Sequence, residues 1–122
     1  MARILVIDDE PDVRSLVEQT LKPAGHEVVP AADGREGVDS YCAKPADLVI
    51  TDIYMPNQEG LETIMELRRR FPDVAIIAMS GWSTAETMLS IAQKLGAVGI
   101  LQKPFVAEEL LAMVGNALRR EA

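Results

Sequence analysis

The stretch ADLVITDIYMP, residues 46–56, decides how the rest of the chain is interpreted. Its apolar run Leu48-Val49-Ile50 is mostly β-branched and is long enough for a strand that is buried on both faces. The run leads to Asp52, and Met55-Pro56 then turns the chain away. Open α/β sheets bind their ligands just beyond the carboxyl ends of their strands. We therefore expect the Asp52 carboxylate to lie at the mouth of such a sheet.

Outward from this stretch, short apolar runs alternate with amphipathic segments. Strands are expected at residues 4–7, 26–30, 48–52, 74–79 and 98–101, and helices that begin near residues 11, 34, 60, 83 and 105. Five strands that alternate with five helices over short linkers predict an α/β, doubly wound parallel sheet with helices on both faces. The strand that contains Pro30 is placed at the sheet edge, because proline cannot donate to a sheet ladder.

Composition narrows the class of protein. With 122 residues the chain is long enough for a packed core, and we expect one domain over residues 1–122. The net charge of −7 argues against direct contact with nucleic acid, because phosphate backbones attract Lys and Arg. One cysteine, no leader after Met1 and no apolar run of membrane-spanning length favour a cytoplasmic location without membrane contact.

Helical spacing also assigns side chains to the core. We expect Cys42 to be a small core residue and Val106 to face inward on the last helix. The methionines at helical spacing, Met65, Met88 and Met113, are expected in the core rather than on a partner surface.

Side chains that carry chemistry follow four of the predicted strands. Asp8-Asp9 follows the first, Asp52 the third, Ser80 the fourth and Lys103 the fifth. Because the carboxyl ends of parallel strands point the same way, these residues are expected to converge on one rim. The aspartate pair could merely cap the first helix, but one residue suffices for a cap that contributes about 1 kcal/mol.

Grouping three carboxylates is costly, because two unit charges about 4 Å apart repel by roughly 4 kcal/mol at an effective dielectric of about 20. A hard divalent cation relieves that repulsion, and Mg²⁺ prefers carboxylate oxygens and retained waters. A cation beside a lysine and a hydroxyl suits phosphoryl transfer. We expect Lys103 to neutralise phosphoryl oxygens, Ser80 to donate a hydrogen bond to them, and Asp52 to attack in line.

At this point the residues resemble the receiver domain of bacterial two-component response regulators over essentially the whole chain. The matching motifs are Asp8-Asp9, Asp52 with Met55-Pro56 and Gly60, Ser80, and Lys103-Pro104-Phe105. The resemblance implies a flavodoxin-like fold, a five-stranded parallel sheet in the order 2-1-3-4-5 with about five flanking helices. It also implies a phosphoacceptor switch that assists its own phosphorylation and dephosphorylation, rather than an enzyme.

The resemblance assigns roles by position. Asp52 would be the phosphoacceptor. Asp9, Asp52 and the backbone carbonyl of Tyr54 would bind Mg²⁺, and Asp8 would act mainly through water. Lys103 would contact the phosphoryl group.

Further implications concern switching and partners. Ser80 would be the switch hydroxyl, and the bond between Lys103 and Pro104 would be cis. The implied donor is a phosphohistidine on a sensor histidine kinase or a histidine phosphotransfer protein, which small acyl phosphates can replace. Output would pass to an output domain or a downstream protein through the fourth helix, fifth strand and fifth helix, and homodimerisation is compatible with this role.

One position departs from the family pattern, and two others stand where the family tunes the lifetime of the phosphoryl group. Ile100 stands where the family has an aromatic switch residue, and isoleucine is stiff at χ1 without a polar tip. It could simply pack under neighbouring helices, or the output signal could travel another way. Tyr54 and Trp82 stand where the family tunes phosphoryl lifetime. They could be surface residues, or together they could screen the acyl phosphate from water.

Two other function classes remain open from sequence. A receiver that never needs phosphate would serve as a docking or dimerisation module, but such domains usually lack part of the acidic set that this chain keeps. A metal-dependent phosphohydrolase on a related fold would need a general acid close after the nucleophile. The residue two positions after Asp52 is Tyr54, so this class is disfavoured.

Overall fold

Strands and helices alternate in the computed structural model, which describes residues 2–53, 60–81 and 86–121. The strands are β1 (Arg3–Ile7), β2 (Glu27–Ala31), β3 (Leu48–Asp52), β4 (Ile76–Ser80) and β5 (Gly99–Gln102). The helices are α1 (Pro11–Leu21), α2 (Gly34–Ala43), α3 (Gly60–Arg70), α4 (Glu86–Lys94) and α5 (Ala107–Glu121). Tyr54, Trp82, the expected helix start at Ser83 and the side chain of Met88 lie outside the described residues.

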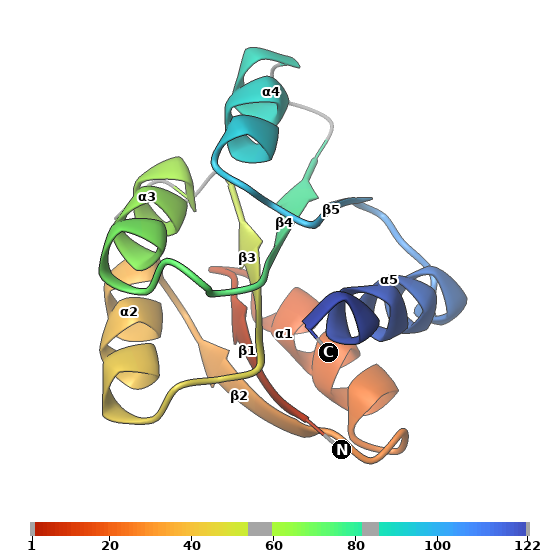
Figure 1. Ribbon diagram of the computed structural model, residues 1–122. Coiled ribbons are helices and arrows are strands. Elements are labelled where there is room, and N and C mark those ends of the chain that lie inside the picture. Colours follow the sequence, from red (N-terminus) through yellow and green to blue (C-terminus); the bar gives the residue numbers. More distant parts are fainter. Residues whose placement is uncertain (1, 54–59, 82–85, 122) are drawn as a thin grey trace.

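All five strands pair in parallel, in the order β2-β1-β3-β4-β5 (Figure 1). This is the predicted flavodoxin-like order. Pro30 lies opposite Val6 in β2, which is an edge strand, so its missing N–H removes no bond from the interior of the sheet. The central strands β3 and β4 are buried at every position, as their apolar, β-branched runs predict.

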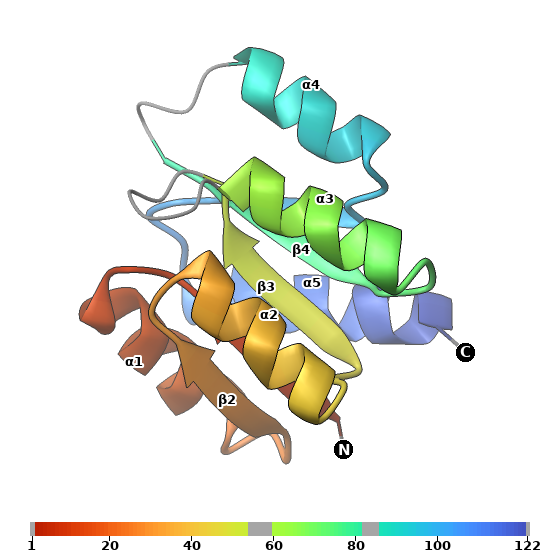
Figure 2. The ribbon, with the colours of Figure 1, turned by 90° about the vertical axis from the view of Figure 1, so that its left-hand side faces the viewer.

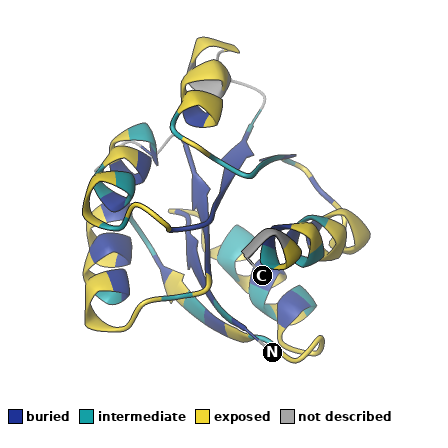
Figure 3. Ribbon diagram, viewed as in Figure 1, coloured by how far each residue is buried: buried dark blue, intermediate teal, exposed yellow. Residues whose placement is uncertain are grey.

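Helices cover both faces of the sheet (Figure 2). Helices α1 and α5 enclose one core, against which Met113 packs as expected, and α2, α3 and α4 contribute to the other. Figure 3 shows the central strands buried and the outer helix faces exposed. Among the described helices, none combines the length and apolarity needed to cross a bilayer.

Three side chains expected in the core are exposed. Cys42 faces solvent, because its neighbour Tyr41 takes the inward position on α2. Met65 is 53% exposed for the same reason, since the adjacent Ile64 is the buried residue on α3. Val106 is 57% exposed because α5 begins one residue later, so helical spacing does not apply to it.

Helix α3 begins against the end of β3. A Cβ atom at Gly60 would overlap with the carbonyl oxygen of Asp52 and with Cα of Ile53. Only glycine allows the helix to approach the backbone this closely. Gly60 therefore fixes the position of the strand end that carries Asp52.

Substituting alanine at Gly60 tests this close approach. We expect Gly60→Ala to lower the free energy of unfolding by about 1–3 kcal/mol, because the added methyl group has to displace backbone atoms. Urea denaturation measures the change. The matched control is Gly115→Ala in α5, where the new Cβ meets only Arg119 Nη1 at 3.6 Å. That change should stabilise the helix by roughly 0.5–1 kcal/mol. Equal stability of the Gly60 variant and the wild type would contradict the assignment.

Candidate functional site

The candidate site lies at the carboxyl rim of the sheet. Asp8 directly follows β1, Asp52 ends β3, Ser80 ends β4 and Lys103 directly follows β5. Backbone hydrogen bonds hold these strand ends in place: the Lys103 amide donates to the Ser80 carbonyl oxygen at 2.7 Å. Ser80 is itself buried. Residues separated by up to 95 positions therefore meet at one rim, as the parallel topology requires.

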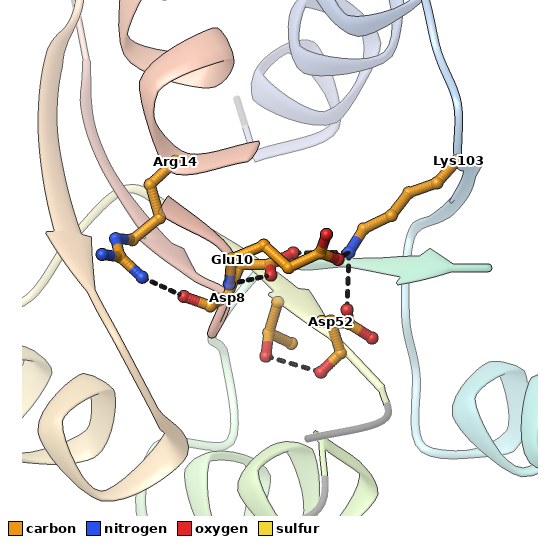
Figure 4. Close-up of polar contacts among 6 residues, drawn as sticks. Asp8, Glu10, Arg14, Asp52 and Lys103 are labelled. Carbon is orange, nitrogen blue, oxygen red and sulfur yellow. Dashed lines mark hydrogen bonds and ion pairs between the residues drawn. The ribbon is translucent and has the colours of Figure 1, made fainter. Parts of the chain in front are cut away.

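The Lys103 ammonium lies among three carboxylates (Figure 4). Its Nζ atom is 2.6 Å from Asp52 Oδ2, 2.7 Å from Asp8 Oδ2 and 3.2 Å from Glu10 Oε1. The contacts with Asp52 and Glu10 are hydrogen bonds. Since the side chains of Lys103, Asp8 and Asp52 are largely buried, the two ion pairs between them are stronger than surface ion pairs.

Asp8 is fully buried beneath this ammonium. Its Oδ1 atom accepts a hydrogen bond from the Glu10 amide at 2.9 Å, which fixes the turn between β1 and α1. Its Oδ2 atom forms an ion pair with the Lys103 ammonium at 2.7 Å. The Lys103 ammonium thus offsets part of the cost of burying this carboxylate.

The loop that carries the aspartate pair is held by α1. Pro11 occupies the first turn of the helix, where its fixed φ angle is favourable. One turn later, Arg14 Nη1 donates to the carbonyl oxygen of Asp8 at 2.7 Å (Figure 4). On the neighbouring strand, Thr51 Oγ1 donates to the carbonyl oxygen of Asp52 at 3.1 Å. The backbone beside both acidic residues is thus restrained.

Burial and charge shift two pKa values in the site. Burial raises the pKa of Asp8 from its ordinary 3.8 to about 6, although the neighbouring Lys103 ammonium opposes the shift. Burial alone would lower the pKa of Lys103, but its contacts with Asp52 and Asp8 outweigh burial and raise that pKa above its ordinary value. Lys103 therefore stays positively charged at neutral pH.

The acidic side chains form a group that suits a hard cation. One carboxylate oxygen from each of Asp8, Asp9, Glu10 and Asp52 lies within 4.8 Å of the others. Asp8 and Asp52 are buried, while Asp9 and Glu10 are exposed. Only carboxylate oxygens are offered, which is the donor set that Mg²⁺ prefers. These residues fit a divalent cation.

Sequence reasoning missed Glu10 and Arg14. Glu10 occupies the N-cap of α1, where Ser, Thr, Asp or Asn are preferred, and its side chain makes no capping hydrogen bond. The sequence signal that could have identified Glu10 is a glutamate at an N-cap position, where helix capping gives no reason for one. Ile100, in contrast, is half-buried on β5 and packs against the core that α2, α3 and α4 cover.

A family model and a curated relative match nearly the whole chain. The model described as response regulator receiver domain matches residues 4–115. A probable transcriptional regulator, ycf27, of Porphyridium aerugineum is 36% identical over 118 residues. The match covers 97% of this chain and 48% of that relative, so the chain spans about half the length of the relative.

Solved structures agree with these matches. A response regulator receiver domain protein from Clostridium thermocellum superposes with a TM-score of 0.91 at 32% identity, covering 99% of this chain and 97% of that one. The chemotaxis protein CheY4 of Vibrio cholerae gives 0.89 at 33% identity, covering 96% and 98%. NtrX from Brucella abortus, in complex with ADP, gives 0.92 at 32% identity, covering 98% of this chain and 27% of NtrX.

The raised pKa of Asp8 predicts a stability change. Because the pKa in the folded state, about 6, exceeds the ordinary 3.8, deprotonation of Asp8 costs stability as the pH rises through this interval. Asp8→Asn keeps an acceptor for the Glu10 amide and removes the buried charge. At pH 7 without divalent cations, we expect the variant to be more stable by about 1–3 kcal/mol.

Urea denaturation at pH 7 and near pH 4 measures this difference. It should shrink at the lower pH, because the folded wild-type protein then carries a protonated Asp8 and no longer buries the charge. Asp12→Asn is the control, because Asp12 is an exposed carboxylate on α1, the helix that follows Asp8. A variant at Asp8 that is less stable than the wild type at pH 7 would contradict the pKa assignment.

Proposed function

The chain belongs to the response regulator receiver family, and from this premise we propose that Asp52 accepts a phosphoryl group from a phosphohistidine donor. Receiver domains act in two-component signalling as switches rather than as turnover enzymes. The observation that carries the proposal is the contact of 2.6 Å between Lys103 Nζ and Asp52 Oδ2, beside an acidic group at the strand ends. This contact places a nucleophilic carboxylate beside an ammonium group that can neutralise the charge of the phosphoryl oxygens.

The proposed reaction transfers one group between two side chains. A carboxylate oxygen of Asp52 attacks phosphorus, the bond between phosphorus and the donor imidazole nitrogen breaks, and an acyl phosphate forms on Asp52. The Lys103 ammonium, already within 2.6 Å of the reacting carboxylate, offsets the charge of the phosphoryl oxygens. Ser80, at the end of the adjacent strand, donates a hydrogen bond to one of those oxygens.

Receiver domains bind Mg²⁺ at an acidic pocket, and the acidic group of this chain fits that role. Asp9, Asp52 and the backbone carbonyl of Tyr54 would hold the ion, with Asp8 acting through water. When bound, Mg²⁺ supplies positive charge for the phosphoryl oxygens.

Phosphorylation changes the charge at the rim and thereby the conformation. A phosphoryl group carries about −1.5 to −2 charges, more than the carboxylate that it esterifies. Attraction toward Lys103 and Ser80 would shift the loop after β4 and change the surface formed by α4, β5 and α5. Ile100 has no polar tip, so the shift would proceed without rotation of an aromatic ring.

The proposed partners follow from this chemistry. A cytoplasmic sensor histidine kinase or histidine phosphotransfer protein would supply the phosphoryl group. An output domain or downstream protein, or a second copy of the chain, would bind the face of α4, β5 and α5. With a net charge of −7, the domain itself would contact neither nucleic acid nor membrane.

Removing the nucleophile tests the proposal. Asp52→Asn should abolish labelling by acetyl phosphate in the presence of Mg²⁺, because the amide cannot form the acyl phosphate. Intact-mass spectrometry of the treated chain measures the label. Asp33→Asn is the matched control, since Asp33 caps α2 through the Glu36 amide and an asparagine caps equally well. Full labelling of the Asp52 variant would refute the assignment.

Tyr54 and Trp82 carry a second prediction, on the lifetime of the acyl phosphate. If their bulk screens the group from water, the double variant Tyr54→Asn with Trp82→Glu should hydrolyse it faster. The decay of labelled protein after removal of acetyl phosphate gives the rate. An unchanged rate would eliminate the screening role for these two side chains.

A further inference from the structure

Glu10 makes a contact that its place in the helix does not require. It is the N-cap residue of α1, yet its side chain accepts no hydrogen bond from the first turn of the helix. Its backbone oxygen serves that turn instead, accepting from the Val13 and Arg14 amides at 3.2 Å. The carboxylate is therefore available for Lys103, 93 positions away along the chain. Aspartate, a better cap, has a side chain shorter by one methylene group.

The Lys103 ammonium is shared between two buried carboxylates and one exposed carboxylate. An ammonium has three N–H donors. One donates to Asp52 and another to Glu10, whose side chain is 61% exposed. The fully buried Asp8 Oδ2 forms an ion pair with Nζ at 2.7 Å. The exposed Glu10 therefore shares the ammonium with two buried carboxylates.

Glu10 is also the partner that Lys103 can release at least cost. Its contact, at 3.2 Å, is the longest of the three. Water can replace a partner at an exposed carboxylate, whereas it cannot reach the buried Asp8 as easily. A new anion beside Asp52 would therefore draw the ammonium away from Glu10 first.

From this arrangement we propose that Glu10 is a positioning residue that competes with the incoming phosphoryl group for the Lys103 ammonium. In the unphosphorylated chain it holds one N–H of Lys103 and places a negative charge at the entrance of the site. Arrival of the phosphoryl group on Asp52 displaces it. Glu10 thereby slows phosphorylation, while its charge favours the divalent cation. The inference rests on the proposed function of Asp52.

Two measurements on Glu10→Gln test the competition, because glutamine has nearly the same shape and lacks the charge. Isothermal titration calorimetry gives the affinity for Mg²⁺, and intact-mass spectrometry gives the rate of labelling by acetyl phosphate at saturating Mg²⁺. We expect the affinity to fall and the rate to rise, each by about two- to fivefold, the size of an exposed ion pair. A purely structural role would not move the two in opposite senses.

Two further variants isolate the route through Lys103. Asp12→Asn removes an exposed charge from the same helix and should change neither quantity. In a Lys103→Gln background, Glu10→Gln should no longer accelerate labelling, since the ammonium for which it competes is absent.

The possible results distinguish a failure of the role inferred for Glu10 from a failure of the function proposed for Asp52. A labelling rate for Glu10→Gln that equals or falls below that of a labelled wild type overturns the inference alone. Acceleration that persists without Lys103 also overturns it, because a general charge effect would then suffice. A wild-type chain that takes no label overturns both the inference and the proposed function.

Discussion

Repulsion among carboxylates is the constraint on which the site depends. Asp8, Asp9, Glu10 and Asp52 bring oxygens within 4.8 Å of one another, and Lys103 is the cation that contacts three of them. Charges at such distances repel by several kcal/mol at a protein dielectric of about 20. The fold tolerates this because the sheet fixes the strand ends rigidly. The excess negative charge that remains is what makes the rim receptive to a divalent cation.

The fold and most of the rim could be predicted from sequence, because both follow from local patterns joined to one topological rule. Buried β-branched runs mark β3 and β4, and Pro30 marks the edge strand. Once the strands are parallel, whatever follows each of them meets at one edge. That rule places Asp8, Asp52 and Lys103 together without any knowledge of their distances.

The features that could not be predicted from sequence are contacts between residues with no regular spacing along the chain. The reach of Glu10 to Lys103 spans 93 positions and obeys no helical or strand spacing. Helical spacing also assigned three exposed side chains to the core. Cys42 and Met65 each lie next to the residue that is buried, and Val106 precedes the first residue of its helix. Periodicity gives the face of a helix to within about one residue, and the ends of helices less well.

The most direct test of the account is a crystal structure of the chain with Mg²⁺ and beryllofluoride, which mimics the phosphoryl group. The account predicts beryllium bonded to an Asp52 oxygen, the ion among the carboxylates at the rim, and Lys103 Nζ in contact with a fluorine atom. Beryllofluoride bound away from Asp52, or a Lys103 ammonium still committed to all three carboxylates, would contradict the central claim that this pocket receives a phosphoryl group.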